Sequence, residues 1–185
     1  MPRKNIPADF VGSPGTLQFA CALFCAAYFM MFLIYNYFFT HIGFTNHTFP
    51  NVWVYRYPSF KTLYEGRWFA DVLIQLTGGS GVPTLQIGLA AGLQIINAFI
   101  FSSIWNVRDR LTIVLLVFLF SFHPALLDYY SFSVDHLSFV FGDTLALLGV
   151  LALDRLKGLK HRHICAIAAF VLALATYQPK IAIFA

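Results

Sequence analysis

The sequence predicts an all-α integral membrane protein, a polytopic helical bundle with about five transmembrane helices, and three observations support this prediction. Of the 185 residues, 59% are hydrophobic and only 11% are charged, whereas charged residues make up about 25% of soluble domains. The mean hydropathy is +0.71. Apolar runs long enough to cross a bilayer recur along the chain. Because a soluble domain of this size needs polar side chains on its exposed surface, these features exclude a soluble enzyme, a nucleic-acid binder and a disordered chain.

The first apolar segment covers residues 17–40 and contains no Lys, Arg, Asp or Glu. At about 1.5 Å per residue, a helix of this length crosses a bilayer core of about 30 Å with some tilt. The segment is too long for the core of a signal peptide and lacks a small-residue cleavage site, so we expect a retained helix. Arg3 and Lys4 precede it, which predicts an N-terminus on the inside.

A polar segment follows at residues 41–83 and is rich in Trp and Tyr, which is typical of a membrane interface. Within it, positions 68, 69, 72, 73 and 76 are apolar and form a helical stripe. We therefore predict a short amphipathic helix over 68–76 that lies along the membrane surface in the first outer loop. The sequence TGGSGVP at 77–83 then breaks the chain.

Four further spans are predicted at residues 84–105, 111–127, 135–153 and 164–184. A tight charged turn, NVRDR, joins the second span to the third, and a strongly basic segment joins the fourth to the fifth. We interpret the whole of 1–185 as a single transmembrane domain. Because the chain finishes on an apolar run, we expect it to be the N-terminal part of a longer protein.

The distribution of basic residues predicts the orientation of these spans, because Lys and Arg are retained on the cytoplasmic side. With the N-terminus inside, the inner segments hold eight of the twelve basic residues. Three others lie in the long outer loop and count slightly against this orientation. The eight inner residues are Arg3, Lys4, Arg108, Arg110, Arg155, Lys157, Lys160 and Arg162.

Five of the eight acidic residues fall outside the membrane or in the outer half of a span in this topology. A carboxylate near hydrocarbon costs about 2.5–3.5 kcal/mol even on a lenient scale, so such residues usually serve a function or pair with a cation. Asp143 follows Asp135 by eight residues on one predicted helix, so both can face the same side. A functional role and a polar packing role both stay open for this pair. The five acids are Glu65, Asp71, Asp128, Asp135 and Asp143.

The tetrapeptide EGRW at 65–68 opens the predicted surface helix. Its glycine permits a sharp turn, Arg67 can grip a phosphate with paired donors, and Glu65 can take a proton from a hydroxyl. The alternative is a capped interfacial helix in which Glu65 pairs with Arg67 or Lys61. The outer histidines show no spacing of a metal-ligand pair, so they are interpreted as polar anchors and no metal site is predicted.

Several stretches of the chain, taken in order, form a recognisable series. They are the first span, the outer-loop stretch YEGRWFADVLIQL (64–76), a short-turned helix pair, the stretch DYYSFSVDHLSFVFGDTLALL (128–148) and the stretch ALATYQPKIAIF (173–184). This series resembles the N-terminal region of the glucosyl transferase II family, the polytopic Gtr-type enzymes that add glucose to bacterial O-antigen. The resemblance extends over nearly the whole chain and over the first part of a typical member.

The resemblance implies a GT-C architecture with the active site in the first large outer loop and its neighbours. It implies that glucose moves from a polyprenyl-phosphate-glucose donor to O-antigen or a related lipid-linked or surface polysaccharide, without nucleotide or other cofactor. The protein would lie in the bacterial inner membrane as a multi-pass protein with a cytoplasmic N-terminus, and would act on its outer side.

The same resemblance suggests which residues would act. Many members carry an acid early in the first outer loop, where this chain reads HTFPNVW at 47–53, so Glu65 or Asp71 would have to supply the base. Together with Asp135 they form the candidate catalytic set. The candidate substrate-binding residues are Arg56, Lys61, Arg67, Asp128, Asp143, Tyr177 and Gln178.

Two other interpretations stay open. A transporter or flippase subunit would use Asp135 and Asp143 to bind a proton or ion within the membrane. Transporters favour acids and broken helices near the midplane, whereas Glu65 and Asp71 lie in an aromatic outer loop. The third interpretation is a catalytically incomplete remnant that inserts into the membrane but lacks the acceptor-binding part.

Overall fold

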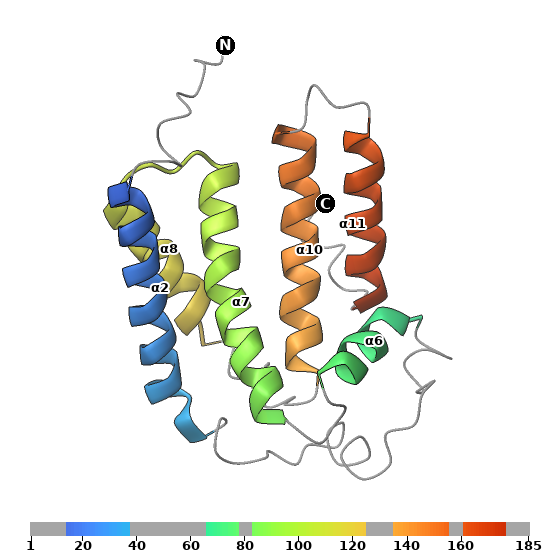
Figure 1. Ribbon diagram of the computed structural model, residues 1–185, viewed down its shortest axis with the longest axis horizontal. Coiled ribbons are helices and arrows are strands. Elements are labelled where there is room, and N and C mark those ends of the chain that lie inside the picture. Colours follow the sequence, from blue (N-terminus) through green and yellow to red (C-terminus); the bar gives the residue numbers. More distant parts are fainter. Residues whose placement is uncertain (1–13, 38–65, 78–82, 125–134, 156–160, 177–185) are drawn as a thin grey trace.

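The computed structural model describes residues 14–37, 66–77, 83–124, 135–155 and 161–176, and every regular element in these ranges is a helix. Figure 1 shows four of these helices, α2, α7, α10 and α11, running side by side, with α8 packed against α2 and α7. The short helix α6 lies across the ends of α10 and α11. The helices are α2 (Pro14–Ile34), α6 (Trp68–Leu76), α7 (Pro83–Ile104), α8 (Arg110–Phe122), α10 (His136–Arg155) and α11 (Arg162–Thr176).

Helix α7 lies at the centre of the bundle because two of its faces are apolar. Ile87 and Ile95 belong to a buried cluster shared with α2 and α8, and they recur at the helical spacing of one face. Ala90 lies on a second face and packs with Leu137 and Val140 of α10. Helix α10 is therefore held on one side by α7 and on the other by α11, its most extensive partner.

The outer faces of the bundle are apolar as well. Phe29 of α2, Leu115 of α8 and Ile167 of α11 are 61%, 60% and 61% exposed. In water, large apolar patches of this kind are rare on monomeric proteins. Their presence on three outer helices is what a lipid environment requires, and it agrees with the composition.

Three helices are long and apolar enough to cross a membrane: Gly15–Ile34, Thr84–Ile104 and His136–Arg155. All three match predicted spans. Within the described residues, α8 and α11 have 13 and 15 residues, or about 20 and 22 Å at 1.5 Å per residue. Helices thus begin near all five predicted positions, and three of them have full spanning length. Residues 125–127 and 177–184 of the predicted third and fifth spans lie outside the described ranges.

The predicted helix over Trp68–Leu76 is confirmed, but its packed face differs from the predicted apolar stripe. The buried positions include Ala70 and Asp71 together with Leu73 and Ile74. Of the stripe, only Leu73 is buried, whereas Leu76 is 78% exposed. Helix α6 therefore packs a mixed face of Ala70, Asp71, Leu73 and Ile74 against the bundle and leaves Trp68 and Leu76 exposed.

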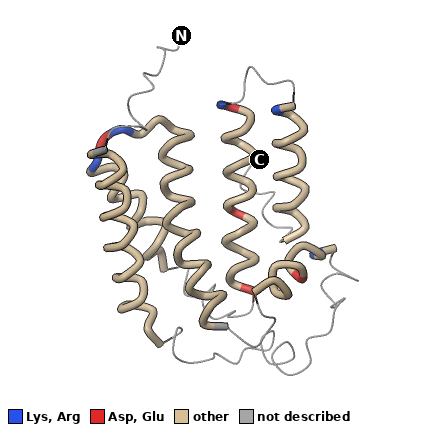
Figure 2. The backbone as a smooth tube through the Cα atoms, in the orientation of Figure 1, with Lys and Arg blue, Asp and Glu red and all other residues tan. Residues whose placement is uncertain are grey.

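Most charged residues of the described chain lie near the two ends of the bundle, and Asp143 lies midway along α10 (Figure 2). The ends of α8, α10 and α11 that carry Arg110, Arg155 and Arg162 lie together. Asp71 in α6 and Asp135 before α10 lie at the opposite end. The predicted grouping of inner basic residues apart from outer acids is therefore reproduced by the fold for the described residues.

Candidate functional site

A group of buried polar side chains lies where α6 crosses the ends of α10 and α11 (Figures 1 and 2). Arg67 is 8% exposed, Asp71 0%, Asp135 4% and His136 1%. Burial of charged groups in an apolar bundle is costly unless they are hydrogen-bonded or paired. We refer to these four residues as the polar end of the bundle.

Arg67 joins all three helices of the polar end. Gly66 precedes it with φ of 67°, a left-handed conformation that glycine adopts without steric cost, as the sequence predicted for a sharp turn. The Nε of Arg67 donates to the carbonyl of Thr176 at 2.9 Å, and its guanidinium lies 5.7 Å from the centre of the Phe139 ring. The last carbonyls of a helix lack partners within it, so Arg67 caps α11 while it packs on α10.

Asp71 lies one turn after Arg67 on α6, so both can occupy the same face of the helix. It falls in the first turn of α6, where the helix dipole stabilises a negative charge. Its complete burial on the face that packs on the bundle distinguishes it from a solvated turn charge. A carboxylate in this position is either part of a polar packing arrangement or part of a reactive site.

Asp135 and His136 begin α10. The carbonyl of Asp135 accepts a hydrogen bond from the amide of Phe139 at 3.1 Å, which puts Asp135 at the N-cap position of α10. His136 follows as the first helical residue and is one of the largest fully buried side chains of the described chain.

The sequence interpretation of His136 as an interfacial polar anchor is wrong, because the side chain is enclosed by the bundle. The signal for its burial was its spacing of four residues from Val140, which lies on the same buried face.

Asp143 lies two turns further along α10, toward the middle of the helix, and is half-buried. Its neighbour Gly142 approaches α11 so closely that an added Cβ would meet the hydroxyl of Thr176. Asp135 therefore lies at the polar end, whereas Asp143 lies about two turns along α10 and is half-buried.

The remaining candidate residues fall outside the described ranges. They are Glu65 and Asp128, the basic residues Arg56 and Lys61, and the pair Tyr177 and Gln178. Among the residues that the structure describes, no group of three His, Cys, Asp or Glu side chains could hold a metal ion.

Comparisons with protein-family models, curated proteins and solved structures find no match to this chain.

Chemically, the polar end offers two carboxylates, an imidazole and a guanidinium at one end of an apolar bundle. Carboxylates and imidazoles exchange protons with a reacting hydroxyl, and a guanidinium stabilises negative charge on a phosphate. In a site with little water, such groups act more strongly than in solution. The arrangement therefore suits a reaction in which a proton is removed and an anionic group departs.

Proposed function

We propose that this chain belongs to a membrane glycosyltransferase that moves glucose from polyprenyl-phosphate-glucose to O-antigen or a related surface polysaccharide. The observation that carries the proposal is the burial of Arg67, Asp71 and Asp135 at one end of a bundle whose outer surface is apolar. A lipid-linked sugar has this same division, because its prenyl chain is apolar and its phosphate and sugar are polar.

The chemistry assigns a role to each group. A carboxylate takes the proton of the acceptor hydroxyl, whose oxygen then forms a bond to the anomeric carbon of glucose. The bond between that carbon and the phosphate oxygen breaks, and the prenyl phosphate leaves with the electron pair. Asp71, Asp135 and Glu65 are the proposed candidates for the base, and the proposed donor carries no nucleotide.

Arg67 is the proposed cation for the departing phosphate. Its Nε donates to the carbonyl of Thr176, and a guanidinium stabilises the negative charge of a phosphate. Arg56 and Lys61 would add positive charge from the outer loop. Asp128, Asp143, Tyr177 and Gln178 are proposed to bind the sugars by hydrogen bonds.

The direct test is a transfer assay with membranes that contain the protein. Radiolabelled glucose on polyprenyl phosphate should appear in the polysaccharide, whereas membranes without the protein should give none. Radiolabelled UDP-glucose in membranes depleted of polyprenyl phosphate should give no product. Transfer from UDP-glucose alone, or no transfer from the lipid-linked donor, would contradict the proposal.

One observation favours a transporter as the second candidate. Asp143 is half-buried two turns inside an apolar helix of spanning length, where intramembrane acids commonly bind a proton or ion. Proteoliposomes would then take up protons or a cation, and Asp143→Asn would abolish the uptake. Glucose transfer by the unaltered protein, without uptake of protons or a cation, would exclude this candidate.

A further inference from the structure

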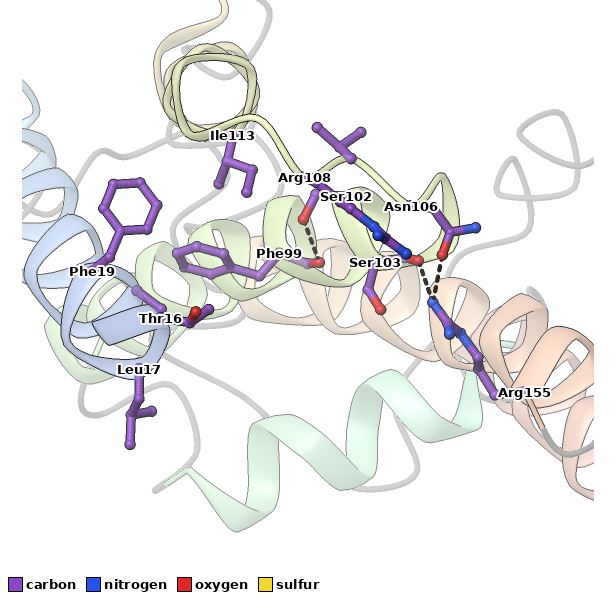
Figure 3. Close-up of a pocket in the computed structure, with 12 residues that line it drawn as sticks. Thr16, Leu17, Phe19, Phe99, Ser102, Ser103, Asn106, Arg108, Ile113 and Arg155 are labelled. Carbon is purple, nitrogen blue, oxygen red and sulfur yellow. Dashed lines mark hydrogen bonds between the residues drawn. The ribbon is translucent and has the colours of Figure 1, made fainter. Parts of the chain in front are cut away.

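A second polar feature lies at the opposite end of the bundle from the candidate site. A pocket of about 320 Å³ opens between the start of α2, the end of α7 and the turn that leads into α8. Ligand pockets in proteins have volumes of about 300–1,000 Å³. Its floor includes Phe19 and Phe99, and its rim includes Arg108 and Arg155 (Figure 3).

The rim of this pocket is held in a defined shape. Arg155, the last residue of α10, donates to the carbonyl of Ser103 at 2.7 Å and to Oδ1 of Asn106 at 3.1 Å. Asn106 has φ of 54°, a conformation that few residues other than glycine adopt. Arg155 therefore fixes the turn, and the exposed Arg108 follows two residues later on the same rim.

The pocket continues as an apolar groove along α2 and α7. A second hollow shares Ala20 and Phe99 with the pocket. A third shares Phe24 and Ile96 with the second. The three hollows follow one another along the seam between the two helices, from the basic end toward the polar end.

The charges around the mouth favour an anion. Arg108, Arg110 and Arg155 lie at this end, and Arg110 packs over the Phe19 ring at 5.2 Å. Two acids lie at this end as well: Asp109 accepts from the amide and hydroxyl of Thr112, and Oδ2 of Asp154 lies 3.6 Å from Nε of Arg155. Arg108 is exposed on the rim and is the residue that would contact the anion. Basic pockets between membrane helices on the cytoplasmic side bind anionic lipid headgroups.

We propose that this pocket binds one anionic phospholipid of the adjoining leaflet. Its phosphate contacts Arg108 at the rim, and one acyl chain lies in the groove between α2 and α7. Residues 17–25 of α2, along the first two hollows, rise about 12 Å, close to the half-thickness of about 15 Å that one leaflet contributes to the bilayer core. The site does not depend on the proposed glucose transfer, because it lies at the other end of the bundle.

Native mass spectrometry of the purified full chain tests the headgroup. The probe is phosphatidylglycerol, compared with phosphatidylcholine of the same acyl chains. We expect one retained phosphatidylglycerol per chain and about tenfold weaker retention in Arg108→Gln, since a hydrogen bond to a charged group is lost. Arg162→Gln is the matched control, because Arg162 lies at the same end of the bundle and lines none of the three hollows.

A second pair of variants tests the groove. Ala20 lines two of the hollows, whereas Ala22 is exposed on α2 and lines none of the three. Ala20→Leu should lower phosphatidylglycerol retention, because the larger side chain fills part of the groove. Ala22→Leu should leave the retention unchanged. Circular dichroism of both variants checks that the helices are intact.

Two results would overturn the proposal. Equal retention of both lipids, or equal loss in Arg108→Gln and Arg162→Gln, would show a general attraction of anions to a basic surface. A dimer that disappears in Ala20→Leu, with no lipid retained by the unaltered chain, would show that a second copy occupies the groove.

Discussion

At the scale of single residues, Arg67 shows how a side chain that looks catalytic in the sequence can also be structural. It links the start of α6 to the end of α11 and to the Phe139 ring. The hydrogen bond joins residues 109 positions apart, so no local pattern could predict it. The side chain therefore contributes to packing at the end of the bundle whether or not it also binds a phosphate.

The structural role of Arg67 gives a stability prediction. Arg67→Met should lower the free energy of unfolding by about 1–3 kcal/mol, because it removes a charged hydrogen bond and leaves a helix-end carbonyl without its donor. Thermal unfolding in detergent measures the change, with the exposed Gln75→Ala on the same helix as the control. Equal stability of both variants would show that Arg67 does not hold α11.

Asp109 gives a pH prediction at the start of α8. Hydrogen bonds from the side chain and the amide of Thr112 lower the pKa of Asp109. A lowered pKa means that the stabilisation is complete above the ordinary Asp value of about 3.9 and is lost as pH falls through the lower folded value. The protection of the Thr112 amide from hydrogen exchange, relative to an unstructured amide at the same pH, should therefore persist at pH 5 and be lost only well below pH 4.

Two substitutions of Asp109 distinguish the effect of its hydrogen bonds to Thr112 from the effect of its negative charge. Asp109→Ala should quicken exchange at Thr112 even at pH 6, whereas Asp109→Asn should preserve slow exchange, since Asn is also a good N-cap residue. If Asp109→Ala exchanged as slowly as the unaltered chain, the cap would not hold the start of α8.

At the scale of helices, the close approach of α10 and α11 depends on two glycines. A Cβ on Gly149 would lie 2.7 Å from Cε1 of Phe170, and a Cβ on Gly142 would meet the buried Thr176 hydroxyl. Small residues that let two helix backbones approach are typical of membrane bundles.

We expect Gly142→Ala and Gly149→Ala each to destabilise the bundle by about 1–3 kcal/mol, as overpacked cores do. Gly92→Ala is the control, because its Cβ would lie 3.7 Å from the Phe24 and Tyr28 rings, an ordinary contact. That control should be neutral or slightly stabilising, since Ala favours a helix by about 1 kcal/mol over Gly. Thermal unfolding distinguishes these outcomes, and equal values for Gly149→Ala and Gly92→Ala would contradict the packing.

The sequence predicts the positions of the helices better than it predicts which side of a helix is buried. Apolar run length located α2, α7 and α10, because a bilayer demands a minimum length. The helix at 68–76 was found from its periodicity, with the glycine-rich break after it marking its end. Which side of α6 packs inward depends on α10 and α11, which lie far away in sequence. Ala70, Asp71 and Ile74 are therefore buried beside Leu73, in place of the other members of the predicted stripe.

The candidate site was predictable only in part. Asp71, Asp135 and Arg67 were singled out by their charge in apolar surroundings, and the fold buries all three at one end of the bundle. His136 was not predicted as part of the site, because the spacing of the histidines indicates no metal-ligand pair. Its burial depends on how the helices pack. The three exposed cysteines, Cys21, Cys25 and Cys165, fall on apolar runs and gave no signal of a site.

At the scale of the whole molecule, the basic residues at one end of the bundle predict which end faces the inside of the cell. In a background without Cys21, Cys25 and Cys165, single cysteines at Gln75 and His161 should label from opposite sides of the membrane, with His161 on the inside. An impermeant thiol reagent applied to intact cells should therefore modify Gln75→Cys alone. Labelling of both from one side would contradict the arrangement of the bundle in the membrane.

The most direct test of the central claim compares acids at the two ends of the bundle in the glucose-transfer assay. Asp71→Asn and Asp135→Asn keep the size of the side chain and remove its charge, so each should insert normally. If Asp71 or Asp135 is the base, transfer by the matching variant should fall by about 10²–10⁴-fold. Asp109→Asn, at the opposite end, should transfer glucose at the unaltered rate. Wild-type transfer by Asp71→Asn, Asp135→Asn and Glu65→Gln alike, at equal protein levels in the membrane, would contradict the proposed base.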